Sequence, residues 1–72
     1  MNVRELVAAN LRRIRSERGM SQEELANSAG VNRTYVSDIE RCVYSISVDK
    51  LAVLASVLNV QPYELLLPTT EG

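Results

Sequence analysis

Polar side chains recur at helical spacing between residues 33 and 41. On a helical wheel, four of them share an arc of about 100° that holds no apolar side chain: Arg33, Thr34, Ser37 and Arg41. An arginine fork can bind guanine O6 and N7, and threonine or serine can bond a base or touch a thymine methyl. This arc predicts a base-reading face; the alternative is the solvated face of an ordinary surface helix.

The composition excludes several other kinds of site. The chain of 72 residues has no histidine and a single cysteine, Cys42, which excludes intrachain disulfides, Cys/His zinc sites and histidine acid/base chemistry. We therefore expect a single small domain that is not an enzyme and has no cofactor, metal or small-molecule ligand. No apolar run is long enough to span a membrane and no signal-type core is present, so we expect a cytoplasmic protein.

The charge is distributed unevenly along the chain. The net charge is −1, but residues 1–18 carry five arginines against two glutamates, while the segment from Cys42 onward has one lysine against three acidic residues. This asymmetry permits a nucleic-acid partner without requiring one.

Helix signals cover almost the whole chain. Apolar residues recur at helical spacing, and capping residues such as Ser21, Asn32 and Ser47 each follow an apolar residue that can pack five positions on. The sequence predicts an all-α domain with five helices, near residues 3–18, 22–29, 33–41, 48–58 and 62–67. Gly30 ends the second helix just before the third begins, which is typical of a helix-turn-helix unit.

This unit suggests which residues bind DNA. The N-terminal part of the second helix in such a unit enters the major groove, so we expect base contacts from Arg33, Thr34 and Ser37. The expected phosphate contacts are Gln22, Asn27, Arg41, Ser45 and Ser47. Tyr35 and Asp38 are borderline, because either could reach backbone or a base depending on helix tilt.

The sequence resembles the lambda-repressor-like, Cro/C1-type (XRE) helix-turn-helix family. The matching residues are Arg15, Gly19, "SQEELA" at 21–26, "AGV" at 29–31, "YVSDIE" at 35–40, "LAVLASVLNV" at 51–60 and "LL" at 65–66. The resemblance implies a five-helix domain over residues 1–67 with a frayed tail at 68–72, and a homodimer on a roughly palindromic double-stranded DNA operator. It also implies an ion pair between Arg15 and Glu40; the alternative is that Arg15 contacts DNA. The segment "NRTYVSDIER" further resembles restriction-modification controller proteins.

Two residues depart from the family pattern after the third helix. Cys42 stands where glycine is usual, and Ile46 stands where proline is common. Cys42 must therefore tolerate a left-handed backbone or end the helix differently. A redox role for Cys42 is the alternative to a structural one, but nothing in the sequence marks a reactive thiolate.

A second apolar stripe indicates a partner surface. We expect five residues to form a self-complementary dimer contact: Val53, Val57, Tyr63, Leu66 and Leu67. The alternative is that the last helix or the tail covers Val53 and Val57. The sequence thus favours a homodimeric transcription regulator; an antitoxin-type interaction module with secondary DNA binding and a purely structural helical domain are the other two interpretations.

Overall fold

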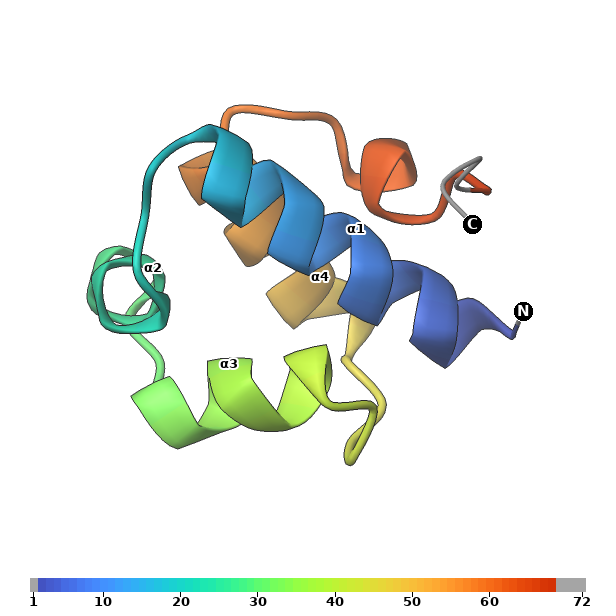
Figure 1. The fold of residues 1–72 in the computed structure, drawn as a ribbon, viewed down its shortest axis with the longest axis horizontal. Helices are drawn as coiled ribbons and strands as arrows, with labels where there is room; N and C mark the ends of the chain where they lie inside the picture. The colour runs from blue at the N-terminus through green and yellow to red at the C-terminus, as the bar shows by residue number, and fades with distance from the viewer. Residues whose placement is uncertain (1, 69–72) are drawn as a thin grey trace.

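The computed structural model describes residues 2–68, which form four α-helices and one short 3-10 helix (Figure 1). The elements in chain order are α1 (Val3–Glu17), α2 (Gln22–Ala29), α3 (Arg33–Glu40), α4 (Val48–Val57) and η1 (Pro62–Leu65). These described residues contain no strand, and no helix among them is long and apolar enough to cross a membrane. The expected tail at 68–72 lies outside them, apart from Pro68.

Each α-helix begins directly after a residue whose side chain caps it. Ser21 Oγ accepts the N–H of Glu24 at 3.0 Å, and Glu24 in return accepts the N–H of Ser21 at 2.9 Å. These hydrogen bonds with Ser21 hold the pKa of Glu24 below its usual value. The side chains of Asn32 and Ser47 accept the N–H groups of Thr34 and Lys50 at the starts of α3 and α4, which confirms the predicted starts of these helices.

All four α-helices end in the same backbone motif. After α2, Gly30 has a φ of 70° and the N–H of Val31 donates to the carbonyl of Ala26, five residues back. This pair of features is the Schellman motif. No atom lies within 4 Å of a Cβ built on Gly30, so glycine is favoured there by its positive φ and not by close packing. After α3 the same left-handed position is occupied by Cys42, with a φ of 62°.

Replacing Cys42 with glycine should stabilise the fold. A left-handed backbone costs an L-residue about 1–2 kcal/mol, of which the greater freedom of glycine in the unfolded chain offsets roughly 0.4–1 kcal/mol. We therefore expect Cys42→Gly to raise the melting temperature by several degrees in thermal denaturation followed by circular dichroism. Cys42→Ala is the control, because it removes the thiol and keeps the Cβ; equal stability of the two variants would contradict this account.

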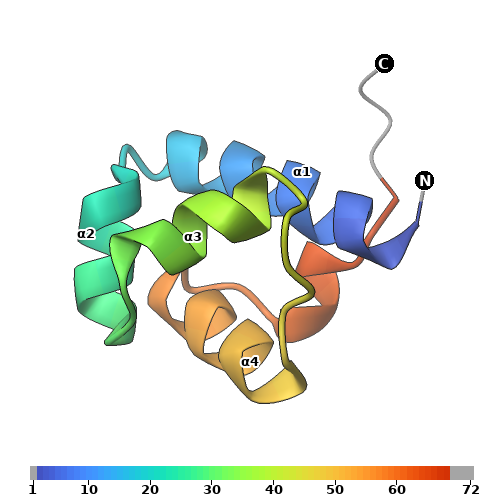
Figure 2. The same cartoon turned by 90° about the horizontal axis from the view of Figure 1, so that it is seen from below.

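The helices enclose one hydrophobic core. Figure 2 shows α3 crossing in front of α1, with α2 at one end and α4 below. Helix α2 supplies Leu25 and Ala26 to the contact with Val36 and Ile39 of α3, and all four are fully buried. Burial of these apolar side chains fixes how α3 is presented, since only its opposite face remains in water.

The fifth helix predicted over 62–67 is wrong in type and in length. Residues 62–65 form a single 3-10 turn, in which the N–H of Leu66 donates to the carbonyl of Tyr63. The buried amide of Asn10 donates to the carbonyls of Leu65 and Leu67 at 3.0 and 2.8 Å. These two carbonyls point at α1, which turns this segment away from an α-helical path.

Candidate nucleic-acid interface

The outward face of α3 presents the residues expected to read bases. Arg33 and Thr34 stand exposed in the first turn of the helix, and Ser37 lies half-buried one turn on. Asn32 Oδ1 accepts the N–H of Thr34 at 2.7 Å, which fixes the start of the helix. Arg33 forms no hydrogen bond or ion pair with any residue between 2 and 68, so its guanidinium is available to a ligand.

Three further predicted contacts of α3 are less available. Asp38 is buried, with its carboxylate 2.7 Å from Nη2 of Arg41, so this pair partly neutralises the charge that Arg41 would offer a phosphate. Tyr35 is half-buried and packs against the core. The sequence pattern did not reveal the burial of Asp38 and Tyr35, because a helical wheel shows the direction of a side chain but does not show what covers it.

An ion pair fastens the end of α3 to α1. Arg15 Nε and Nη2 donate to the two carboxylate oxygens of Glu40 at 2.7 and 3.1 Å, and Arg15 Nη1 donates to the carbonyl of Met20 at 2.8 Å. The hydrogen bond to Glu40 raises the pKa of Arg15. The ion pair between Arg15 and Glu40, here called the clamp, is the one that the family resemblance implies. The hydrogen bonds of the Arg15 guanidinium leave little of it free to bind DNA.

Gln22 joins this clamp at the start of α2. Its amide nitrogen donates to Glu40 Oε1 at 3.0 Å, which leaves the second N–H free to bind a phosphate. Gln22 and Arg33 line one polar hollow between the first turns of α2 and α3, together with Arg15, Ser21 and Glu23. A phosphate group in this hollow would meet two positive helix ends and the guanidinium of Arg33.

The remaining predicted phosphate contacts lie on exposed positions. Asn27 is exposed on α2, and Ser47 Oγ accepts the N–H of Lys50 at 3.1 Å as the cap of α4. Ser45 lies between α3 and α4, where its Oγ accepts hydrogen bonds from Arg4. Both hydroxyls retain a proton that can be donated to a phosphate oxygen.

The arginines within residues 1–18 have mainly structural partners. Arg12 donates to the carbonyl of Glu40 at the end of α3, and Arg18 donates to the carbonyl of Leu58 at the end of α4 at 3.1 Å. Helix ends leave carbonyls without intrahelical partners, and these arginines satisfy them. The positive charge of residues 1–18 therefore does not form a DNA-binding stripe along α1.

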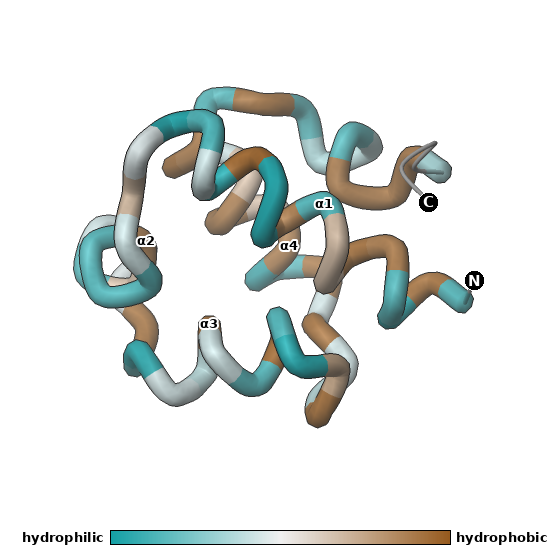
Figure 3. Tube along the Cα trace, viewed as in Figure 1, coloured by the Kyte–Doolittle hydropathy of each residue, from teal (hydrophilic) through white to brown (hydrophobic). Residues whose placement is uncertain are grey.

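Apolar side chains gather on α4 and η1, on the surface predicted to form the dimer contact. Figure 3 shows a hydrophobic stretch of the chain near its C-terminal end, where the sequence has Leu65, Leu66 and Leu67. Val53, Tyr63, Leu66 and Leu67 are exposed, whereas Val57 is half-buried and packs against the core. Within residues 2–68, Val57 is therefore partly covered by the core, whereas Val53 is exposed.

Asn10 is a functional candidate that the sequence pattern did not reveal. It is buried within the apolar stripe of α1, and its amide holds the backbone of the segment that carries Leu66 and Leu67. The signal that could have found it is a polar residue at a core-facing position between Val7 and Leu11.

Two short helices joined by a tight glycine turn, with the second helix presenting free polar side chains, define a helix-turn-helix DNA-binding domain. Within residues 2–68 no group of His, Cys, Asp and Glu side chains could hold a metal ion. The helix-turn-helix family pattern matches residues 11–65, and the chain belongs to this family.

Several proteins are similar to this chain. The control protein C.BamHI of Bacillus amyloliquefaciens is 44% identical over 72 residues, which cover 99% of this chain and 89% of that protein. A hypothetical transcription factor of Neisseria meningitidis is 43% identical over 70 residues, and the chain spans 66% of its length. The crystal structure of this Neisseria factor has a TM-score of 0.90, covering 93% of this chain and 77% of that one.

One solved relative contains DNA. The master regulator for biofilm formation SinR, solved in complex with DNA, has a TM-score of 0.81 and 35% sequence identity. The aligned region covers 85% of this chain and 98% of that chain. The resemblance to Cro/C1-type regulators and controller proteins is thereby confirmed.

Proposed function

We propose that this chain is a cytoplasmic transcription regulator that binds a roughly palindromic operator as a homodimer. Helix α3 enters the major groove, where Arg33, Thr34 and Ser37 contact bases. Phosphates on either side are held by Gln22, Asn27, Arg41, Ser45 and Ser47. The similarity to DNA-binding regulators supports DNA as the ligand.

The observation that carries this proposal is the clamp behind α3. A helix that reads bases must be held rigidly, because a hydrogen bond to a base edge tolerates little displacement. Arg12, Arg15 and Gln22 all bind Glu40, so the last residue of α3 is fastened to both α1 and α2. Arg33 and Thr34 at the start of α3 are meanwhile exposed to solvent, as a reading surface requires.

Selection of bound sequences from a pool of random duplexes tests this proposal. We expect enrichment of two inverted half-sites, with centres separated by about one helical turn, and a footprint that covers both. A single unrepeated half-site would contradict binding as a dimer, and no enrichment at all would contradict sequence-specific binding.

Control of a restriction-modification system is the regulatory role that one solved structure favours, because the restriction-modification controller protein C.AhdI is 35% identical to this chain with a TM-score of 0.83. The similarity to the control protein C.BamHI extends over nearly the whole of both chains. We expect the selected operator to occur upstream of a restriction endonuclease gene next to the gene for this chain. Its absence there would assign the regulator to another set of genes.

The dimer contact is proposed to lie on Val53, Tyr63, Leu66 and Leu67. Val53→Glu should convert the dimer to a folded monomer, because it places a charge in an exposed apolar surface and leaves the buried face of α4 intact. Sedimentation velocity measures the change. Val53 is the better site for this test than Val57, which packs against the core.

Val48→Glu is the matched control for the dimer test. Val48 is on the same helix and exposed, but it lies outside the proposed contact. We expect this variant to remain a dimer. A dimeric Val53→Glu protein, or a monomeric Val48→Glu protein, would place the interface elsewhere.

A further inference from the structure

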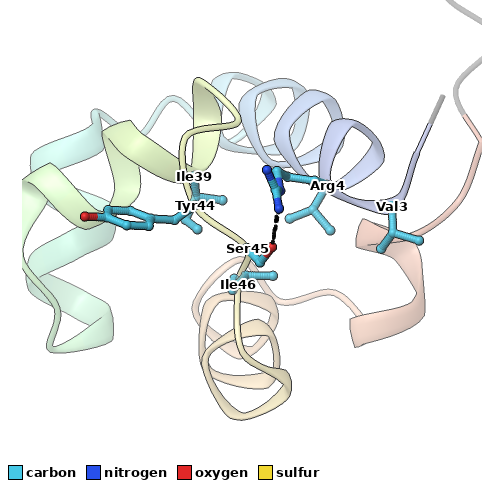
Figure 4. A pocket seen from close by; sticks show the side chains of 7 residues that line it. Val3, Arg4, Ile39, Tyr44, Ser45 and Ile46 are labelled. Atoms are coloured by element: carbon cyan, nitrogen blue, oxygen red, sulfur yellow. Dashed lines mark hydrogen bonds between the residues drawn. The ribbon is translucent and has the colours of Figure 1, made fainter.

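Arg4 and Ser45 come from distant parts of the chain and meet at one edge of the proposed DNA-binding surface. Arg4 belongs to the first turn of α1, and Ser45 lies in the segment that joins α3 to α4. Arg4 Nε and Nη2 both donate to Ser45 Oγ, at 3.2 and 2.9 Å (Figure 4). The two residues are exposed.

This arrangement directs the proton of the Ser45 hydroxyl away from Arg4. A serine hydroxyl has two acceptor lone pairs and one donor proton. Two N–H groups of Arg4 occupy the acceptor side of Ser45 Oγ, so its proton can be donated only to a further acceptor. The guanidinium also has N–H groups that this contact does not use. Together the pair offers several donors and no acceptor.

The pair also carries a positive charge that is not neutralised. Within residues 2–68, Arg13, Arg15 and Arg41 form ion pairs with carboxylates, whereas the only partner of the Arg4 guanidinium is the neutral hydroxyl of Ser45. A cluster of donors with a net positive charge is suited to an anion, and a phosphate oxygen accepts from arginine and hydroxyl groups alike.

The position of the pair fits a phosphate of the same DNA that α3 would read. Figure 2 shows the segment after α3 running beside the N-terminal half of α1 on its way to α4. Ser45 is two residues before Ser47, the cap of α4, and four residues after Arg41. A DNA backbone that follows this segment would therefore pass Arg4.

We propose that Arg4 and Ser45 form a composite phosphate-binding site through which the first helix holds the operator backbone. The inference rests on the proposed function, because the phosphate belongs to DNA bound by α3. Arg4 supplies the charge and fixes the direction of the Ser45 hydroxyl, and the bound phosphate sets how far α3 lies along the groove. The site adds a sequence-independent contact from α1, whose other arginines bind within the fold.

The salt dependence of DNA binding tests this site. Each phosphate neutralised in B-DNA contributes about −0.9 to the slope of log K against log salt. Arg4→Ala should therefore make the slope shallower by about 0.9 for each subunit and weaken all duplex sequences by the same factor. Arg4→Lys should keep most of the slope, because its charge is retained. Arg13→Ala is the control on the same helix and should leave the slope unchanged, since Arg13 is paired with Glu17.

A double-mutant cycle with Ser45→Ala tests whether the two residues act as one site. We expect the loss of affinity in the double variant to be smaller than the product of the two single losses, because either change disrupts the same site. Independent losses would overturn the composite site. An altered base preference in Arg4→Ala would also overturn the composite site. An unchanged salt slope in this variant would overturn it too, and would leave Arg4 with only a structural role, in which it holds the segment after α3 against α1.

The failure of this inference is distinguishable from failure of the proposed function. If the wild-type protein enriches no duplex in the selection experiment, the proposed function fails and the phosphate site fails with it. If the wild type binds its operator and Arg4→Ala keeps the full salt slope, only the phosphate site is overturned. Thermal denaturation of each variant ensures that the proteins compared are folded.

Discussion

Glu40→Ala should lower the free energy of unfolding by about 3–5 kcal/mol, the range found when one partner of a buried ion pair is removed. The Glu40 side chain is only 3% exposed, and it accepts three hydrogen bonds from Arg15 and Gln22. Alanine would leave these donors without a partner and would open a gap behind α3. For a domain of this size the melting temperature should fall by roughly 12 °C or more, measured by circular dichroism or calorimetry.

Glu17→Ala provides the matched control. Glu17 also pairs with an arginine of α1, but its side chain is 53% exposed and that of its partner Arg13 is 36% exposed. Exposed pairs four residues apart on a helix contribute only about 0.3–0.5 kcal/mol. We expect the Glu17 variant to melt within a few degrees of wild type. Equal stability of the two variants would show that the buried pair does not hold α3 in place.

The helix boundaries could be predicted closely because their signals are local. Ser21, Asn32 and Ser47 cap helices that begin at the next residue, and Gly30 ends α2 where its positive φ is needed. The type of the final element could not be predicted in this way. Its path depends on the amide of Asn10, which lies 55 residues from Leu65 in the chain.

The candidate site could be predicted as a surface but not in its connections. The helical wheel places Arg33, Thr34 and Ser37 outward, and the structure leaves Arg33 and Thr34 exposed and Ser37 half-buried. The wheel gives no sign that Gln22 would be held by Glu40, because this contact joins α2 to α3 and depends on how the two helices pack. Arg41 and Asp38 are three residues apart at the end of α3, a spacing that permits their ion pair without showing that it forms.

The charge of the first helix shows the same limit. A local excess of arginine was compatible with a DNA-binding stripe, yet Arg12 and Arg18 satisfy the carbonyl ends of other helices. Only the fold shows which arginines have partners and which do not. Arg4 and Arg33 are the two that lie near the proposed DNA and form no ion pair within residues 2–68.

Arg33→Ala should reduce operator affinity by about 1–3 kcal/mol per half-site and relax selectivity at one symmetric base position. Arg33 is exposed in the first turn of α3, the end of the helix that enters the groove first in this motif. Its planar fork can bond guanine O6 and N7 together, and no described residue competes for it. If the proposed homodimer binds two half-sites, its loss of affinity should be about twice the value for one half-site.

The geometry also allows a competing role for Arg33, which the same experiment distinguishes. Arg33 lines the polar hollow shared with Gln22, so it could bind a phosphate there and touch no base. In that case Arg33→Ala would weaken every sequence equally, with a salt slope shallower by about one unit for each phosphate that is no longer neutralised. Arg33→Lys separates charge from shape: it should keep the salt slope but lose the guanine preference, because lysine lacks the planar fork. Binding-site selections on wild type and both variants provide the comparison, and identical base preferences in all three would refute the base-reading role even if affinity fell.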